Sequence, residues 1–177
     1  MGYYSCSMLL LFTLLLSFYP ISSADLIKQT CKATKYYDLC VSSLKSDSTS
    51  PKADTKGLAV IMVRVAVANA TSTISYLSSQ MLSVVANDTS VKRAMKECGE
   101  KYAFANEALK SSSQDLSDEL YDYAYMHVMA AADYPNACHN AFRRSPGLVY
   151  PPEMALREDG LKRICDVVLG IIDALGS

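Results

Sequence analysis

The chain has 177 residues, half of them hydrophobic, and its 17 basic and 18 acidic residues leave a formal net charge of −1. This length suits one domain with a substantial core. The balanced charge, with no basic stripe, excludes a typical nucleic-acid-binding protein.

The first stretch has the features of a secretory signal. Residues Met8–Leu16 are nearly all apolar, and the small residues Ser22–Ala24 suit cleavage behind them. The apolar run is shorter than the roughly 20 residues that a membrane-spanning helix needs. We therefore expect residues 1–24 to be removed and residues 25–177 to form one secreted domain, without a membrane partner after cleavage.

Apolar residues at helical spacing predict a long helix after Ser50-Pro51, where a cap residue precedes a proline suited to the first helical position. The alternation of three and four residues continues over some 30 residues, roughly eight turns. Its members are Val60, Val63, Val67, Ala70, Ile74, Leu77 and Met81.

The stretch from Cys98 to Cys138 predicts a helical hairpin. Two arms with apolar faces flank the polar run Ser111-Ser112-Ser113, so we place the turn at this run and expect antiparallel helices. The expected core positions are Val91, Met95, Cys98, Tyr102, Ala105 and Leu109 in the first arm, and Leu120, Ala124, Val128, Ala131, Cys138 and Phe142 in the second.

A last helix is predicted after Pro151-Pro152. No run with a period of two residues is long enough for a sheet. Four amphipathic helices, preceded by a short cysteine-stapled helical segment, therefore predict an all-α, up-down-up-down four-helix bundle. The core positions expected in the last helix are Leu161, Ile164, Val168, Ile171 and Leu175.

Removal of the signal leaves an odd number of cysteines, which predicts two disulfides and either a free thiol or an intermolecular bond. Spacing favours Cys31 with Cys40 and Cys98 with Cys138, because each pair brackets a helix-turn unit. Cys165 would then be free, and its apolar surroundings indicate a buried, inert thiol. The cysteines are too dispersed for a zinc site, and we expect no metal.

Two N-glycosylation sequons, at Asn69 and Asn87, agree with a secretory route. Asn87 lies in a polar break between helices and is the favoured acceptor. Asn69 falls inside a helical run, where a glycan needs an exposed face.

Catalytic motifs are missing from the sequence. It contains no GxSxG, no HExxH and no phosphate-binding glycine loop, and it has only two histidines. A carboxylate cluster on the hairpin is interpreted as a solvated helix face rather than a glycosidase pair. We therefore expect a protein that is not an enzyme and that uses no cofactor. The cluster consists of Asp118, Glu119, Asp122 and Asp133.

Tyrosines are concentrated at the start of the second arm of the hairpin. Tyr121, Tyr123 and Tyr125 flank the predicted core stripe. Tyrosine is favoured at protein interfaces because it buries a large area at low entropic cost. The pattern predicts either a binding face or rings packed at the seams of the bundle.

Several short patterns occur together in the chain. They are Cys31, Thr34, Leu39, Cys40 and Leu44, the stretch SDSTSPKADTKGLA, KEC with Tyr102 four residues after its cysteine, and MAAADYPNAC with Phe142 beyond. In these patterns the whole mature chain resembles the plant inhibitors of pectin methylesterase and invertase.

The resemblance implies a bundle with an N-terminal disulfide-stapled helical hairpin, secreted to the cell wall and monomeric when free. Such a protein would block a carbohydrate-active enzyme through a reversible one-to-one complex. In that family the first cysteine pairs with the second and the third with the fourth, in agreement with the pairing that spacing favours.

The resemblance leaves two target enzymes open. Invertase inhibitors of the best understood type carry Pro-Lys-Phe early in the third bundle helix, where this chain has Tyr121-Asp122-Tyr123. Pectin methylesterase inhibitors commonly have an Asp-Tyr pair there, and Tyr121 matches its tyrosine whereas Leu120 replaces its aspartate. We favour pectin methylesterase, with acid invertase as the alternative. The expected target-binding residues are Tyr121, Asp122, Tyr123 and Tyr125.

Two other hypotheses involve no inhibition. A secreted bundle could carry an apolar ligand between its helices, although methionine at helical spacing is usually core filler. A structural or allergen-like protein would have kept the bundle and lost the activity. The methionines that could line a ligand cavity are Met62, Met81, Met126 and Met129.

Overall fold

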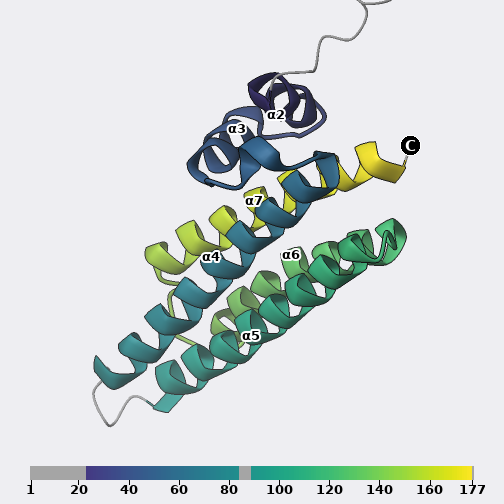
Figure 1. The fold of residues 1–177 in the computed structure, drawn as a ribbon. Coiled ribbons are helices and arrows are strands. Elements are labelled where there is room, and N and C mark those ends of the chain that lie inside the picture. Colours follow the sequence, from purple (N-terminus) through teal and green to yellow (C-terminus); the bar gives the residue numbers. More distant parts are fainter. Residues whose placement is uncertain (1–22, 84–88, 177) are drawn as a thin grey trace, which may run out of the picture.

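The computed structural model describes residues 23–83 and 89–176, and it contains only helices in these ranges. Four long helices, α4 (Thr55–Ser83), α5 (Thr89–Ser117), α6 (Tyr121–Arg143) and α7 (Pro152–Gly176), alternate in direction and form one bundle (Figure 1). The predicted all-α bundle is therefore confirmed. Nearly all of the predicted signal segment, and the sequon at Asn87, lie outside the described residues.

A small hairpin of α2 (Ser23–Lys32) and α3 (Tyr37–Ser46) packs on α4 and α7 near the C-terminal end of α7 (Figure 1). Cys31 and Cys40 join its helices through a disulfide with a Cα–Cα distance of 5.6 Å. Ile27 and Leu44 are buried in the common core. The hairpin therefore packs on the α4–α7 side of the bundle and shares its core, rather than forming a separate unit.

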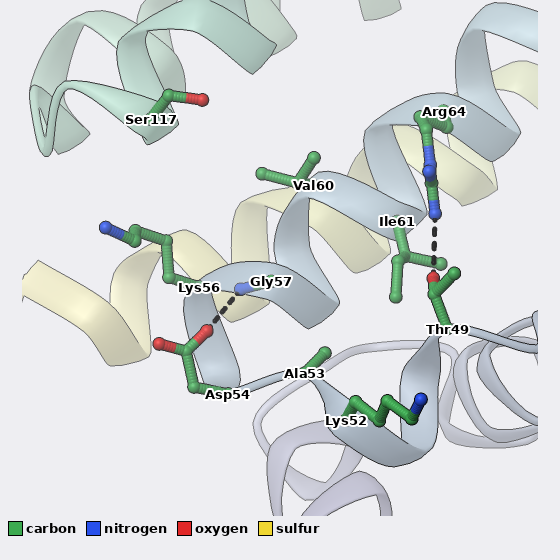
Figure 2. Close-up of a pocket in the computed structure, with 10 residues that line it drawn as sticks. All are labelled: Thr49, Lys52, Ala53, Asp54, Lys56, Gly57, Val60, Ile61, Arg64 and Ser117. Carbon is green, nitrogen blue, oxygen red and sulfur yellow. Dashed lines mark hydrogen bonds between the residues drawn. The ribbon is translucent and has the colours of Figure 1, made fainter.

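The start of α4 differs from the prediction. Ser50–Lys52 form only one 3-10 turn (η1), after which the backbone of Ala53 is extended, and α4 begins at Thr55. The carboxylate of Asp54 accepts a hydrogen bond from the Gly57 N–H at 2.7 Å (Figure 2). Asp54 therefore caps α4, a role that the sequence analysis gave to Ser50.

α4 is apolar on several sides because its neighbours cover it on several sides. α5 and α7 pack along it, and the α2–α3 hairpin contacts it near its start. Adjacent residues such as Ile61, Met62 and Val63 are consequently all buried. Residues Thr55–Leu82 have the length and hydropathy of a membrane span, and their place in the bundle core accounts for this composition.

The turn between α5 and α6 lies later than predicted. α5 continues through the serine run to Ser117, because Ser112 and Leu116 extend its buried face by two more positions. The Ser117 hydroxyl donates to the Ser113 carbonyl oxygen at 3.0 Å, so this serine is accommodated within the helix. The placement of the turn at residues 111–113 was therefore wrong.

The α5–α6 hairpin is joined near its open end by a disulfide between Cys98 and Cys138, with a Cα–Cα distance of 4.4 Å. Cys165 on α7 is free and buried. Burial raises the pKa of its thiol to about 12, and the neighbouring Asp166 carboxylate adds to the shift. The thiolate, which is the reactive form, is therefore scarce at Cys165.

Gly170 lets the α2–α3 hairpin approach α7. A Cβ atom added there would lie 2.8 Å from the Ala33 carbonyl oxygen and 3.0 Å from the Thr34 Cα. Lys35 in the same connection pairs with Asp166 of α7 at 3.1 Å. The small hairpin thus depends on close backbone contact at one glycine.

We expect Gly170→Ala to destabilise the protein by about 1–3 kcal/mol, because the backbone of residues 33–34 must move away. Gly99→Ala is the matched control, since nothing lies within 4 Å of its added Cβ and alanine favours the helix by up to about 1 kcal/mol. Urea denaturation measures both. Equal stabilities for the two variants would contradict the proposed role of Gly170.

Candidate functional site

The turn that leads into α6 is closed by backbone hydrogen bonds. The Leu120 N–H donates to the Asp115 carbonyl oxygen at 2.8 Å, and the Glu119 N–H donates to that of Leu116 at 3.3 Å. This is the Schellman pattern, which requires a left-handed residue at its centre. That residue is Glu119, with φ of 61°, where glycine is the usual choice.

Two side-chain contacts hold this end of the bundle together. The His127 Nδ1–H donates to the Asp115 carboxylate at 2.6 Å and joins α6 to α5. The Lys56 ammonium donates to the Glu119 carboxylate at 2.8 Å, which joins α4 to the turn and raises the pKa of Lys56. The first turns of α6 are therefore joined to α5 through His127, and the exposed Lys56–Glu119 pair adds a weaker contact with α4.

The four predicted target-binding residues occupy the first turns of α6, where they divide into two kinds. Asp122 is exposed, and 59% of Tyr123 is exposed. Tyr121 and Tyr125 are half-buried and pack against the core, as the seam-packing alternative required. Only Tyr123 offers most of its ring to a partner.

Two surface hollows lie along the seam between α6 and α7, and we call them together the α6–α7 groove. The first is lined by Tyr121, Asp122, Tyr125 and Met126 of α6 and by Ile172, Asp173 and Gly176 of α7. The second lies farther along the same two helices and is lined by Met129, Ala132, Asp133, Lys162, Asp166 and Leu169. The structure therefore brings three of the predicted residues together with α7, whereas Tyr123 lies at the neighbouring hollow beside Leu120.

The sequence analysis missed part of this surface. Leu120 was expected in the core, but it lies in the turn and is exposed. Met126 and Met129 were considered as core filler or cavity lining, and they too are exposed. Tyr123 and Met126, and likewise Met126 and Met129, are three residues apart, so each pair lies at neighbouring positions on the helix surface, and this signal was present in the sequence.

Carboxylates surround this apolar surface. Asp118, Glu119 and Asp122 on the turn and Asp173 on α7 are all exposed, as the interpretation of a solvated acidic face expected. Within residues 23–83 and 89–176, no group of three or more His, Cys, Asp or Glu side chains lies together so as to hold a metal ion. The arrangement offers aromatic and apolar contacts rimmed by hydrogen-bond acceptors.

A second groove at this end lies between η1, the first turns of α4 and Ser117 (Figure 2). Two of its cations have partners within the chain. Arg64 pairs with Asp47 at 3.1 Å, and Lys56 pairs with Glu119. The first pair attaches the segment after α3 to α4, and the second attaches α4 to the α5–α6 turn, so we assign the groove a structural role.

The sequon at Asn69 lies in the seam between α4 and α7. A Cβ atom added to Gly160 of α7 would lie 3.6 Å from the Asn69 amide nitrogen, and the amide oxygen of Asn69 is buried. A glycan attached to this nitrogen would have to separate the helices. The expectation of a glycan at Asn69 therefore conflicts with its packing.

The sequence matches a known protein family over most of its length. The family described as plant invertase/pectin methylesterase inhibitor matches residues 25–171. The chain belongs to this family. It is accordingly an enzyme inhibitor by family and not an enzyme, as the absence of catalytic motifs indicated.

Two relatives of this inhibitor are named for different targets. It is 54% identical over 172 residues to the cell wall / vacuolar inhibitor of fructosidase 2 of Arabidopsis thaliana, covering 94% of this chain and 95% of the relative. It is 38% identical over 161 residues to pectinesterase inhibitor 28 of Oryza sativa subsp. japonica, covering 88% of this chain and 71% of the relative.

A solved structure shares the fold. The crystal structure of a pectin methylesterase inhibitor from Arabidopsis thaliana matches with a TM-score of 0.61 at 23% identity, over 84% of this chain and 95% of that one. At this identity the likeness supports the helical architecture and does not discriminate between target enzymes.

The left-handed residue of the turn gives a stability test. Glu119→Gly relieves the left-handed backbone, whereas Glu119→Gln keeps it, and both variants lose the ion pair with Lys56. That pair is exposed and contributes little. We expect the Gly variant to exceed the Gln variant by about 1 kcal/mol in free energy of unfolding, measured in urea. Indistinguishable variants would show that the turn stores no such strain.

Proposed function

We propose that the protein is a secreted inhibitor of an acid invertase, a β-fructosidase, and that it forms a reversible one-to-one complex with this enzyme. The observation that carries the choice is the 54% identity, over nearly the full length of both chains, to an inhibitor named for fructosidase. The sequence analysis favoured pectin methylesterase on fewer positions around Tyr121. Free inhibitor is expected to be a monomer.

The proposed contact surface is the turn end of the α5–α6 hairpin. Tyr123 is its exposed anchor, Asp122 its acceptor, and Tyr121 and Tyr125 shape the groove beside them. An exposed tyrosine on a rigid helix can be buried by a partner at little entropic cost. A complex of ordinary size would cover about 800 Å² of each protein, which extends beyond these four residues.

Pectin methylesterase remains the second candidate, because the turn end is acidic. Pectin freed of its methyl esters is a polyanion, so a cleft that holds it should carry positive potential. The exposed carboxylates Asp118, Asp122 and Asp173 would be attracted to such a cleft. The relative named pectinesterase inhibitor 28 agrees with this alternative.

The route to the target is also part of the proposal. We infer that residues 1–24 are a signal peptide, that the mature protein enters the cell wall, and that Asn87 is the sequon open to glycosylation. The apolar stretch Met8–Leu16 and the cell wall / vacuolar name of the fructosidase-inhibitor relative support this route. Of the four methionines that could line an apolar-ligand cavity, Met126 and Met129 are exposed on α6, which weakens the carrier hypothesis.

The choice of target is tested by titrating the secreted protein against an acid invertase and a plant pectin methylesterase at pH 5 and pH 7. We expect invertase to be inhibited with one-to-one stoichiometry and the esterase to remain active. Inhibition of the esterase alone would reverse the order of the two candidates. Failure against several isoforms of both enzymes would contradict the proposed function.

The anchor role of Tyr123 is tested by truncation. Tyr123→Ala should weaken inhibition by about 5- to 30-fold, as expected for a buried aromatic interface residue. Tyr37→Ala is the matched control, since Tyr37 is also exposed but lies on α3. Inhibition constants for the two variants measure the difference. Equal constants would place the contact surface elsewhere.

A further inference from the structure

The methionines of the described residues differ widely in exposure. Met126 is 63% exposed and Met129 is 53% exposed, whereas Met62 and Met154 are at most 1% exposed. Met95 is buried as well, and Met81 is half-buried at the far end of α4. The two exposed methionines lie three residues apart on α6.

The described cysteines offer little competition for an oxidant. Four of them are already in disulfides, and Cys165 is buried, with burial raising its pKa to about 12. A thiol reacts with peroxide through its thiolate, and the raised pKa of Cys165 makes this form scarce. Oxidation of the folded protein should therefore begin at Met126 and Met129.

These two methionines continue the proposed contact surface. Met126 lines the same groove as Tyr121, Asp122 and Tyr125, and Met129 lines the next part of the groove with Leu169. From Tyr123 to Met126, and again from Met126 to Met129, the helix rises by about 4.5 Å and turns by about 60°. Tyr123 and Met126 are therefore close neighbours on the helix surface, as are Met126 and Met129. A partner of ordinary interface size that covers Tyr123 would cover Met126 as well.

We propose that Met126 and Met129 are modification sites, at which hydrogen peroxide forms methionine sulfoxide and thereby weakens binding of the target enzyme. In each reaction the thioether sulfur attacks one peroxide oxygen, the O–O bond breaks, and sulfoxide and water are formed. Sulfur is oxidised by two electrons and peroxide is reduced. The loss of binding rests on the proposed function, whereas the oxidation itself does not.

The physical effect follows from the polarity of the product. A sulfoxide turns a flexible apolar side chain into a polar one with a strong acceptor. Buried against an apolar partner, that oxygen would lack a hydrogen-bond donor, and the loss of solvation opposes binding. Of the charged groups nearby, the carboxylates of Asp122 and Asp133 are acceptors, and the ammonium of Lys162 beside Met129 already donates to Glu158 and Asn136 at 2.6 Å.

The test treats the full-length chain, secreted by a yeast host, with increasing hydrogen peroxide, and removes the oxidant before assay. Peptide mass spectrometry reports sulfoxide at each methionine, and titration against acid invertase gives the inhibition constant. We expect sulfoxide at Met126 and Met129 well before Met62 and Met154, with inhibition at least about tenfold weaker and circular dichroism unchanged. Methionine sulfoxide reductases MsrA and MsrB should restore the constant.

Two variants make the result specific. For the double variant Met126→Leu, Met129→Leu, the inhibition constant is measured before and after peroxide treatment. The ratio of the treated to the untreated inhibition constant should stay near one. Met154→Leu, a change in the core, should respond to peroxide as the parent protein does. A parent protein whose constant is unchanged after both methionines are oxidised would overturn the proposal, as would a double variant that responds equally.

The two levels of the proposal fail separately. Oxidation of Met154 as early as Met126 would refute the modification sites whatever the inhibition assay shows. If the untreated protein inhibits neither invertase nor esterase, the proposed function and the loss of binding are both refuted, while the mass spectra still decide the sites.

Discussion

The antiparallel register of α5 and α6 is the constraint on which the rest of the structure depends. The disulfide Cys98–Cys138 fixes it at one end, and the hydrogen bond between His127 and Asp115 fixes it near the other. The two cysteines are 40 residues apart in the sequence, and the disulfide that closes this loop stabilises the fold by about 4 kcal/mol in the chain-entropy model. If α6 shifted by one residue relative to α5, the helix face that carries Tyr123 and Met126 would turn by about 100°.

The remaining elements support this register. α4 and α7 complete the core, and Lys56 of α4 reaches the turn at Glu119. The small α2–α3 hairpin packs on the α4–α7 side of the bundle because Gly170 allows backbone contact there. The turn end of the α5–α6 hairpin thus combines the exposed Tyr123 with a groove beside it and an acidic rim. Binding through such a surface requires little ordering of the inhibitor, which favours affinity.

Sequence periodicity predicted the helices because the buried residues repeat at intervals of three and four, and the spacing of the cysteines favoured the two disulfides that the structure contains. The predicted position of the α5–α6 turn was wrong because serines are typical of turns. In the structure Ser112 is buried within α5, and Leu116 continues the buried face of this helix. The true turn centres on Glu119, a residue with no particular preference for a left-handed backbone. The contact of Gly170 with Ala33 joins segments far apart in the chain, and no local pattern could show it.

We propose that the turn end of the α5–α6 hairpin contacts the target enzyme. Amide hydrogen exchange of the inhibitor, alone and with saturating acid invertase, locates the contact. We expect slower exchange in the complex for residues 115–130 and 169–176, and little change for residues 91–98 and 138–150. Protection of the latter segments, with the turn unchanged, would contradict it.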